Sequence, residues 1–209
     1  MESLPHFPNL LTEMVDFLRT QNLALSRDSL DGRINSTFNE DEILNKLSKK
    51  FPINHSKKRD WFDFSFREND IFYPVNIKVS TTKTRDNLNC KLGIYYALTG
   101  KEPDFDNEIK WADFFIALKD NIQENSKDYY FLIVNKNNPN DIVATSLKRL
   151  KDIKPEGNNL PFQAKWDANR EIITRDFEGA KDFLLGTFEK SLKLRADAYL
   201  SYKRYFCES

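Results

Sequence analysis

The chain has 209 residues, which is long enough to bury a hydrophobic core and to form one compact domain. Charged residues make up 31% of the chain and aromatic residues 13%, whereas Gly and Pro are sparse, and this composition excludes a disordered tail. The 32 basic residues balance the 32 acidic residues, and a net charge of zero counts against a generally basic nucleic-acid binder, although the distribution of charge matters more than its sum.

The two cysteines, Cys90 and Cys207, have no metal-type spacing, so the sequence predicts neither a disulfide framework nor a zinc site. The N-terminal segment contains an acid and two prolines and lacks the basic and apolar parts of a secretion signal. No apolar run approaches the length of a membrane span. We therefore expect a soluble protein of a reducing cytoplasm, with no membrane association.

The first two predicted elements are helices. Apolar side chains at helical spacing predict a helix over Asn9–Leu25, and the polar segment Ser26–Phe38 is expected to be a loop. A second helix is expected to follow and to run to about Lys50, because Pro52 prevents its continuation. The apolar faces of the two helices contain Leu10, Leu11, Met14, Phe17 and Leu18, and Ile43, Leu44, Leu47 and Phe51.

Strands are predicted in the middle of the chain. The segment from Trp61 to Val79 predicts two antiparallel strands joined by the polar turn Arg67–Asp70. The polar segment Ser80–Asn89 follows, and the apolar run Leu92–Leu98 is too short to assign by periodicity. Further strands are expected over Trp111–Leu118, Tyr129–Asn135 and Ile142–Ala144.

The last part of the chain is expected to be mostly helix and loop. Ser146–Lys151 predicts a short basic helix, and Pro155–Pro161 predicts a loop. From Phe177 onward, apolar residues at helical spacing predict a long C-terminal helix that Gly186 interrupts only weakly. Together the elements predict one α/β domain with a mixed central β-sheet flanked by helices.

The pair of strands carries the most informative residues of the chain. Asp63 opens the first strand, and the second ends in Asn76-Ile77-Lys78, where residues 76 and 78 share a face because side chains alternate along a strand. Antiparallel pairing would bring the Asp63 carboxylate near the Lys78 ammonium. A carboxylate, an oxygen ligand and a lysine at one strand end can bind Mg²⁺, with Mn²⁺ as a substitute, and activate a water for attack on a phosphodiester. Lys78 would orient the water and stabilise the phosphate charge in the transition state.

Asn76 is the weakest part of this arrangement as a metal site. An amide oxygen can bind Mg²⁺, but it brings no negative charge and should hold the ion more loosely. Three explanations remain open: Asn76 is natural and another acid supplies the charge, or it is an engineered inactivating substitution, or the protein binds without cutting.

Glu40 is the candidate for the compensating acid. At about 100° per residue it lies on the centre line of the apolar face of the second helix, one turn before Leu44, whereas Glu42 points nearly opposite. Glu42 is expected to serve the start of the helix, and an alternative for Glu40 is a capping box with Thr37.

The segment after the second strand is rich in amide and basic side chains, which suit contacts with base edges and phosphates, although an ordinary polar loop would have the same composition. The candidate DNA-binding residues there are Lys83, Arg85, Asn87, Asn89 and Lys91.

In these residues and their order the chain resembles type II restriction endonucleases of the PD-(D/E)xK superfamily, specifically the EcoRV-like branch. Phe62-Asp63 stands for the usual Pro-Asp, and Asn76-Ile77-Lys78 stands for the acid-x-Lys motif. Segments in the same order that resemble the family are Ile43–Leu47, Asp63–Phe66, Ile77–Thr81, Leu92–Tyr95, Ser146–Lys148, Lys154-Pro155 and Phe162–Trp166.

The resemblance implies a prokaryotic homodimer that straddles double-stranded DNA, reads a short palindrome and cleaves each strand with Mg²⁺, and a cognate DNA methyltransferase that protects the host DNA. It implies that Asp63 and Lys78 are catalytic, and it places base recognition after Trp166, in Asp167–Arg175. Asn169 and Arg170 have suitable chemistry there, because Asn pairs with adenine and Arg with guanine in the major groove.

The sequence thus predicts a type II site-specific deoxyribonuclease with Asp63, Asn76, Lys78 and Glu40 as catalytic residues and Asp63, Asn76 and Glu40 as metal ligands. Two alternatives stay open: a catalytically silent DNA-binding protein with a nuclease fold, and a structure-specific DNA repair nuclease. The single domain is expected to comprise an N-terminal helix and loop (1–38), a catalytic core (39–100), further strands with the recognition region (101–175) and a C-terminal helix (176–209).

Overall fold

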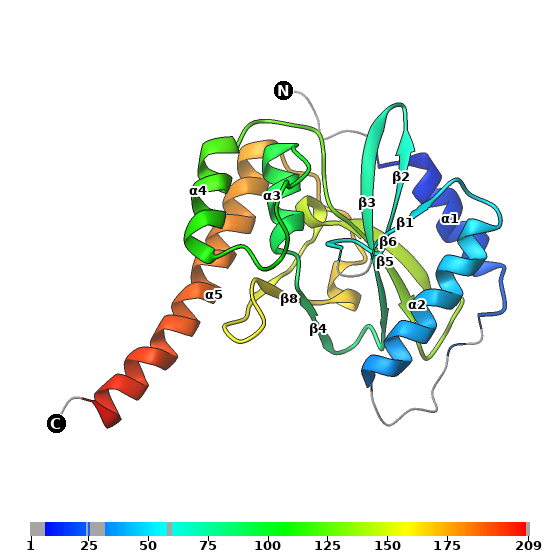
Figure 1. The fold of residues 1–209 in the computed structure, drawn as a ribbon. Coiled ribbons are helices and arrows are strands. Elements are labelled where there is room, and N and C mark those ends of the chain that lie inside the picture. Colours follow the sequence, from blue (N-terminus) through cyan, green and yellow to red (C-terminus); the bar gives the residue numbers. More distant parts are fainter. Residues whose placement is uncertain (1–6, 24, 26–31, 58–59, 208–209) are drawn as a thin grey trace.

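The computed structural model describes residues 7–23, 25, 32–57 and 60–207, and in 32–37 only the backbone. A mixed five-stranded sheet, with strand order β1-β2-β3-β5-β6, lies at the centre (Figure 1). Among the strand pairs of the described residues, β3–β5 alone is parallel, and a smaller antiparallel sheet has the order β4-β8-β7. The strands are β1 (Asn54–His55), β2 (Phe64–Glu68), β3 (Ile71–Ser80), β4 (Arg85–Leu88), β5 (Tyr130–Asn135), β6 (Ile142–Ser146), β7 (Lys154–Pro155) and β8 (Phe162–Lys165).

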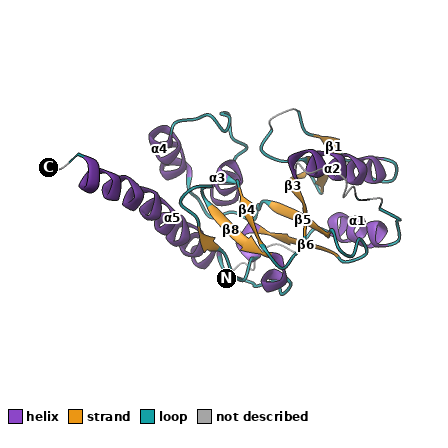
Figure 2. Cartoon of the chain, turned by 90° about the horizontal axis from the view of Figure 1, so that it is seen from below, coloured by secondary structure: helices purple, strands orange, loops and turns teal. Residues whose placement is uncertain are grey.

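Helices cover both faces of the central sheet. The helices α1 and α2 lie on one face and α3, α4 and α5 lie on the other, so the described part of the protein is an α/β fold with a mixed sheet between helices (Figures 1 and 2). The helical elements are α1 (Asn9–Arg19), α2 (Gly32–Ser48), α3 (Lys91–Thr99), α4 (Trp111–Asn121) and α5 (Phe177–Phe206), with short 3₁₀ turns η1 (Leu147–Arg149) and η2 (Trp166–Asn169).

The interior strand β5 contributes to both hydrophobic cores. Leu132 packs in the core under α1 and α2, and Phe131 and Ile133 pack in the core under α3, α4 and α5. Because both faces of β5 are buried, nearly all its side chains are apolar, and this explains the continuous apolar run in the sequence. The predicted strand over Tyr129–Asn135 is therefore confirmed, as is the extension of the sheet by β6.

The predicted strand pair is confirmed as well. In the antiparallel β2–β3 hairpin, Phe64 pairs with Val75 and Glu68 pairs with Ile71. The turn contains Asn69 and Asp70, both with positive φ angles of 52° and 62°, which Asn and Asp adopt more readily than other non-glycine residues.

The predicted strand over Trp111–Leu118 is wrong, because this segment is part of helix α4. Its aromatic and β-branched content favours a strand, but Trp111, Phe114 and Leu118 also have helical spacing. In α4, Phe114 and Leu118 are buried, while Ile116 is 59% exposed. The periodicity was the correct signal here and the residue types were misleading.

The boundaries of the first two helices also differ from the prediction. Helix α1 ends at Arg19, earlier than the predicted Leu25. Helix α2 begins at Gly32, so Gly32–Phe38 is helix and the prediction of a loop there is wrong, while 26–31 lie outside the described residues. Since Glu40 and Glu42 are then in the helix interior, the capping box and the role of Glu42 at the helix start are wrong.

Two further segments were decided by tertiary contacts. The apolar run near Leu92 is helix α3, which is buried on all sides and so has no amphipathic period. The polar segment Ser80–Asn89 contains strand β4, which pairs with β8 and so depends on residues far along the chain.

The last part of the chain follows the prediction in its helices and its loop, but strands β7 and β8 were not predicted. The short basic helix is the buried η1, the 155–161 loop follows β7, and α5 passes through Gly186 without interruption. Among the described helices, none has a long enough apolar stretch to cross a membrane.

Candidate active site

Asp63 lies next to the end of the β2–β3 pairing, where the two strands separate. Strand β2 starts at Phe64, and Asp63 itself makes only one backbone bond to β3, from its N–H to the carbonyl oxygen of Val75 at 2.9 Å. Beyond this point no strand of the described residues pairs with β3 on the β2 side, and the N–H of Ile77 has no backbone partner from such a strand. The Asp63 carboxylate takes that place and accepts this N–H through Oδ2 at 2.6 Å.

Asn76 contacts the same carboxylate. Its Nδ2 donates to Asp63 Oδ2 at 2.8 Å, so the two residues that the sequence placed on facing strands do meet. The Asp63 Oδ1 atom has no hydrogen-bond partner among the residues that the structure describes, and it is the carboxylate oxygen left for a ligand.

Burial raises the pKa of Asp63 from 3.8 to about 6. The Ile77 N–H opposes this shift, the Glu40 carboxylate adds to it, and the Lys78 ammonium lowers the pKa again. A half-buried carboxylate with a raised pKa beside a second acid and a lysine is typical of functional sites. Glu40, Asp63 and Lys78 therefore lie within electrostatic range of one another, as predicted.

Lys78 lines two neighbouring cavities. One, of about 270 Å³, is also lined by Asn76, Asn89 and the exposed Asp60. The other, of about 200 Å³, is also lined by Glu40 and by Asp86 of β4. The ammonium group thus stands beside both the Asp63–Asn76 pair and a second pair of acids.

Asp86 was missed by the sequence reasoning. It accepts a hydrogen bond from the indole Nε1 of Trp166, which is buried in η2, and this contact orients the carboxylate. The other carboxylate oxygen, Oδ1, has no hydrogen-bond partner within the described ranges. No local pattern could have found Asp86, because its position depends on the β4–β8 pairing and on an indole distant in sequence.

Tyr129 contacts the segment that directly precedes Asp63. The Tyr129 hydroxyl donates to the carbonyl oxygen of Trp61 at 2.7 Å, and the two rings stack with centroids 5.7 Å apart. Gly93 of α3 packs against the Tyr129 ring so closely that an added Cβ would lie 2.7 Å from it. This close packing of α3 on the Tyr129 ring fixes the segment that presents Asp63.

The predicted DNA-binding residues after β3 have different environments. Lys83, Arg85 and Asn89 are exposed, and Asn89 borders the larger cavity. Asn87 lines the smaller cavity and accepts from Gln163 Nε2 through its Oδ1 at 2.9 Å. Lys91 is buried, and its Nζ donates to the carbonyl oxygens of Asn107 and Ile109, so in this structure Lys91 anchors a loop and does not face the site.

Asn169 and Arg170 are both engaged within the fold. Asn169 is 3% exposed, and its side chain bonds the backbone of Asp152 and Lys165. Arg170 makes a bidentate pair with Asp141, both bonds 2.8 Å long, and this pair lowers the pKa of Asp141 to about 2. In this structure neither side chain could reach a base without giving up these bonds.

The oxygen atoms around Lys78 are of the chemical kind that Mg²⁺ prefers. Mg²⁺ prefers hard oxygen ligands, and in nucleic-acid enzymes one or two carboxylates, several waters and phosphate oxygens complete its shell. Within the described ranges, no three acidic, His or Cys side chains are gathered closely enough to enclose an ion by themselves. Asp63 Oδ1, with Glu40 or Asp86, would provide the protein share of such a site.

Comparison with the models of known protein families gives no match, and no curated protein is significantly similar to the chain.

Proposed function

We propose that this protein is a Mg²⁺-dependent endonuclease that cleaves double-stranded DNA, with a core of the PD-(D/E)xK kind. The observation that supports this best is the convergence of Asp63, Asn76 and Lys78 where β2 leaves β3, with Glu40 close enough to raise the pKa of Asp63. A raised carboxylate pKa in a water-accessible cavity beside an ammonium suits metal-assisted phosphodiester hydrolysis.

Each residue has a chemical task in this proposal. Bound Mg²⁺ would lower the pKa of a water and neutralise charge on the phosphate. Lys78 would donate to a non-bridging phosphate oxygen and would stabilise the charge that develops as water attacks the phosphorus. Asp63 would hold its Oδ1 toward the ion, because the Ile77 N–H and the Asn76 amide fix its Oδ2. Breakage of the P–O3′ bond would leave a 5′-phosphate and a 3′-hydroxyl.

The restriction-enzyme form of the proposal adds specificity and symmetry. A type II enzyme would act as a homodimer on a short palindrome, because a two-fold axis in the protein matches a two-fold axis in its DNA site. A methyltransferase of the same specificity would then protect the host DNA.

One observation favours a second candidate, a catalytically silent DNA-binding protein. The Asn76 amide donates a hydrogen bond to Asp63 and so stabilises the carboxylate without a metal. An acid at this position would instead repel Asp63 and would favour binding of a cation.

Cleavage of a mixed, unmethylated genomic DNA tests the proposal. We expect discrete fragments with Mg²⁺ or Mn²⁺, and faster cleavage at low metal concentration after Asn76→Asp, because the added charge should raise metal affinity by about tenfold. Fragments produced only by Asn76→Asp would favour the second candidate, a catalytically silent DNA-binding protein. If neither protein cuts with either metal, the nuclease proposal is wrong.

Asp86 gives a second test, which does not depend on cleavage. We expect Asp86→Asn to weaken Mn²⁺ binding by about tenfold in calorimetry, since the variant removes one of the acids beside Lys78. The indole of Trp166 can still donate to the amide oxygen, so the fold should be kept. Unchanged Mn²⁺ affinity would exclude Asp86 as a ligand and would leave Asp63 and Glu40.

A further inference from the structure

The C-terminal part of α5 projects from the body of the protein, as Figures 1 and 2 show. The first half of the helix is packed, with Leu184 and Phe188 in the core. Arg195 marks the place where the helix leaves the body: its guanidinium donates to the carbonyl oxygens of Gly157 and Asn158, both at 2.8 Å. Every residue from Lys193 to Cys207 is exposed.

The stripe that faces the core in the first half continues along this projecting end. After Leu184 and Phe188, the side chains of Tyr199, Tyr202 and Phe206 follow on the same side of the helix. They are 64%, 57% and 76% exposed, and the rings of Tyr202 and Phe206 lie 5.1 Å apart. Several aromatic side chains exposed together indicate contact with a partner.

The charge of the projecting end shows which kind of partner fits. The segment Lys193–Phe206 contains four basic residues and one acid, for a net charge of +3, whereas the whole chain is neutral. The rest of the protein is therefore net negative. Such a segment attracts a polyanion and would repel the same segment of a second copy.

We propose that the projecting end of α5, Lys193–Phe206, binds the sugar–phosphate backbone of duplex DNA. This inference rests on the proposed function for its partner, and it adds a contact surface outside the site around Asp63. Lys193 and Arg204 are about three turns apart and share one side of the helix, where both can reach phosphates. Around the helix axis the aromatic stripe lies nearly opposite Lys193 and Arg204, so these two basic side chains carry the phosphate contact.

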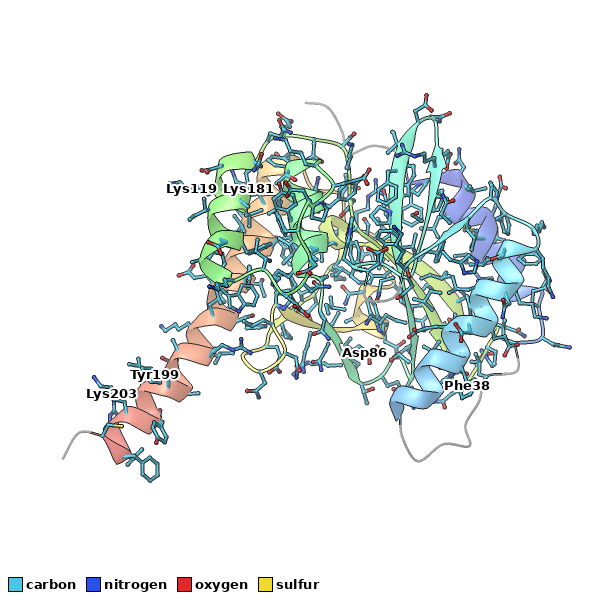
Figure 3. All side chains as sticks on the ribbon, in the orientation of Figure 1. Phe38, Asp86, Lys119, Lys181, Tyr199 and Lys203 are labelled. Atoms are coloured by element: carbon cyan, nitrogen blue, oxygen red, sulfur yellow. The ribbon has the colours of Figure 1, made fainter. Side chains whose placement is uncertain are left out.

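The dimensions and placement agree with this assignment. The projecting end is about 21 Å long, which corresponds to about six base pairs of duplex. Tyr199 and Lys203 on the projecting end, and Asp86 beside the site, lie toward the same lower side of the molecule in Figure 3. One duplex could therefore meet both regions from that side.

Fluorescence anisotropy with a labelled duplex of about 30 base pairs, in EDTA and over roughly 50–200 mM salt, tests the assignment. We expect Lys193→Glu with Arg204→Glu to weaken binding by about 10- to 100-fold and to reduce the salt slope by about 2. The matched control is Lys110→Glu with Lys119→Glu, which makes the same charge change at two exposed positions, one directly before α4 and one on it, and should bind normally.

The outcomes separate this proposal from the nuclease proposal. Normal binding by the Lys193/Arg204 variant, or no binding by the unmodified protein, would overturn the role of α5, whatever the cleavage assay shows. Weakened DNA binding by the Lys193/Arg204 variant, together with no cleavage by the unmodified protein, would support the role of α5 and count against the nuclease proposal. Sedimentation that shows a dimer dissociated by Tyr199→Ala, with unchanged DNA affinity, would assign the aromatic stripe to a second copy and would overturn the proposal.

Discussion

Replacing Lys78 with Ala is expected to reduce the rate of DNA cleavage by about three orders of magnitude. Lys78 is the cation beside the Asp63–Asn76 pair, and it borders both cavities of the site. In the proposed mechanism, the charge that develops on the phosphate would then lose its contact with the ammonium group. The pKa of Asp63 should also rise further, because Lys78 now lowers it. Gel assays of cleavage over a range of pH would measure both effects.

The loss of cleavage activity should come from the chemical step and not from weaker DNA binding. Lys119→Ala removes the same charge from an exposed position on α4, and it should change the cleavage rate by less than about tenfold. Lys78→Ala should still bind duplex DNA in EDTA, since the phosphate contacts outside the site remain. If Lys78→Ala cleaves at a rate close to that of the unmodified protein, Lys78 has no catalytic role and the site is misassigned.

Replacing Asp63 with Asn is expected to abolish cleavage and, at the same time, to stabilise the metal-free protein above pH 7. Burial raises the pKa of Asp63 to about 6, so the folded protein carries an unfavourable carboxylate at neutral pH. The neutral amide removes this cost, and its oxygen can still accept the Ile77 N–H. We expect an increase of about 1–2 kcal/mol in the free energy of unfolding, or about 2–6 °C in melting temperature.

The pH dependence has a definite sign. Between pH 3.8 and about 6 the folded protein keeps a proton on Asp63 that the unfolded chain has lost, so the stability of the unmodified protein falls as pH rises through this window. The advantage of Asp63→Asn should therefore vanish below about pH 4 and be complete above about pH 7. Melting curves in EDTA from pH 3.5 to 8 (roughly spanning the two pKa values) measure this directly.

Two controls make this prediction sharp. Asp182→Asn, on the exposed side of α5, should show no such pH-dependent gain. Mg²⁺ should stabilise the unmodified protein but not Asp63→Asn, because the ion binds the ionised carboxylate. A destabilised Asp63→Asn at pH 7.5 and at all other pH values would mean that Asp63 is held by contacts stronger than its burial cost.

The local pattern of the sequence determined the parts of the fold that depend on neighbouring residues. The β2–β3 hairpin, with its polar turn, follows from alternation and from Asn69-Asp70, so Asp63 and Asn76 could be placed together without a structure. The continuous apolar run of β5 and the periodic face of α5 are equally local signals. The helical phase of Glu40 was enough to point it toward Lys78, although the helix begins earlier than expected.

Only the tertiary structure decided the elements whose partners are distant in the chain. Strand β4 exists because it pairs with β8, and this pairing brings Asp86 beside Lys78 and under the indole of Trp166. The fate of polar side chains was also invisible in the sequence: Lys91, Asn169 and Arg170 have the chemistry to bind DNA, yet the folded chain uses all three internally. The residue type determines which hydrogen bonds a side chain is able to make, and packing between distant segments decides which of them it makes.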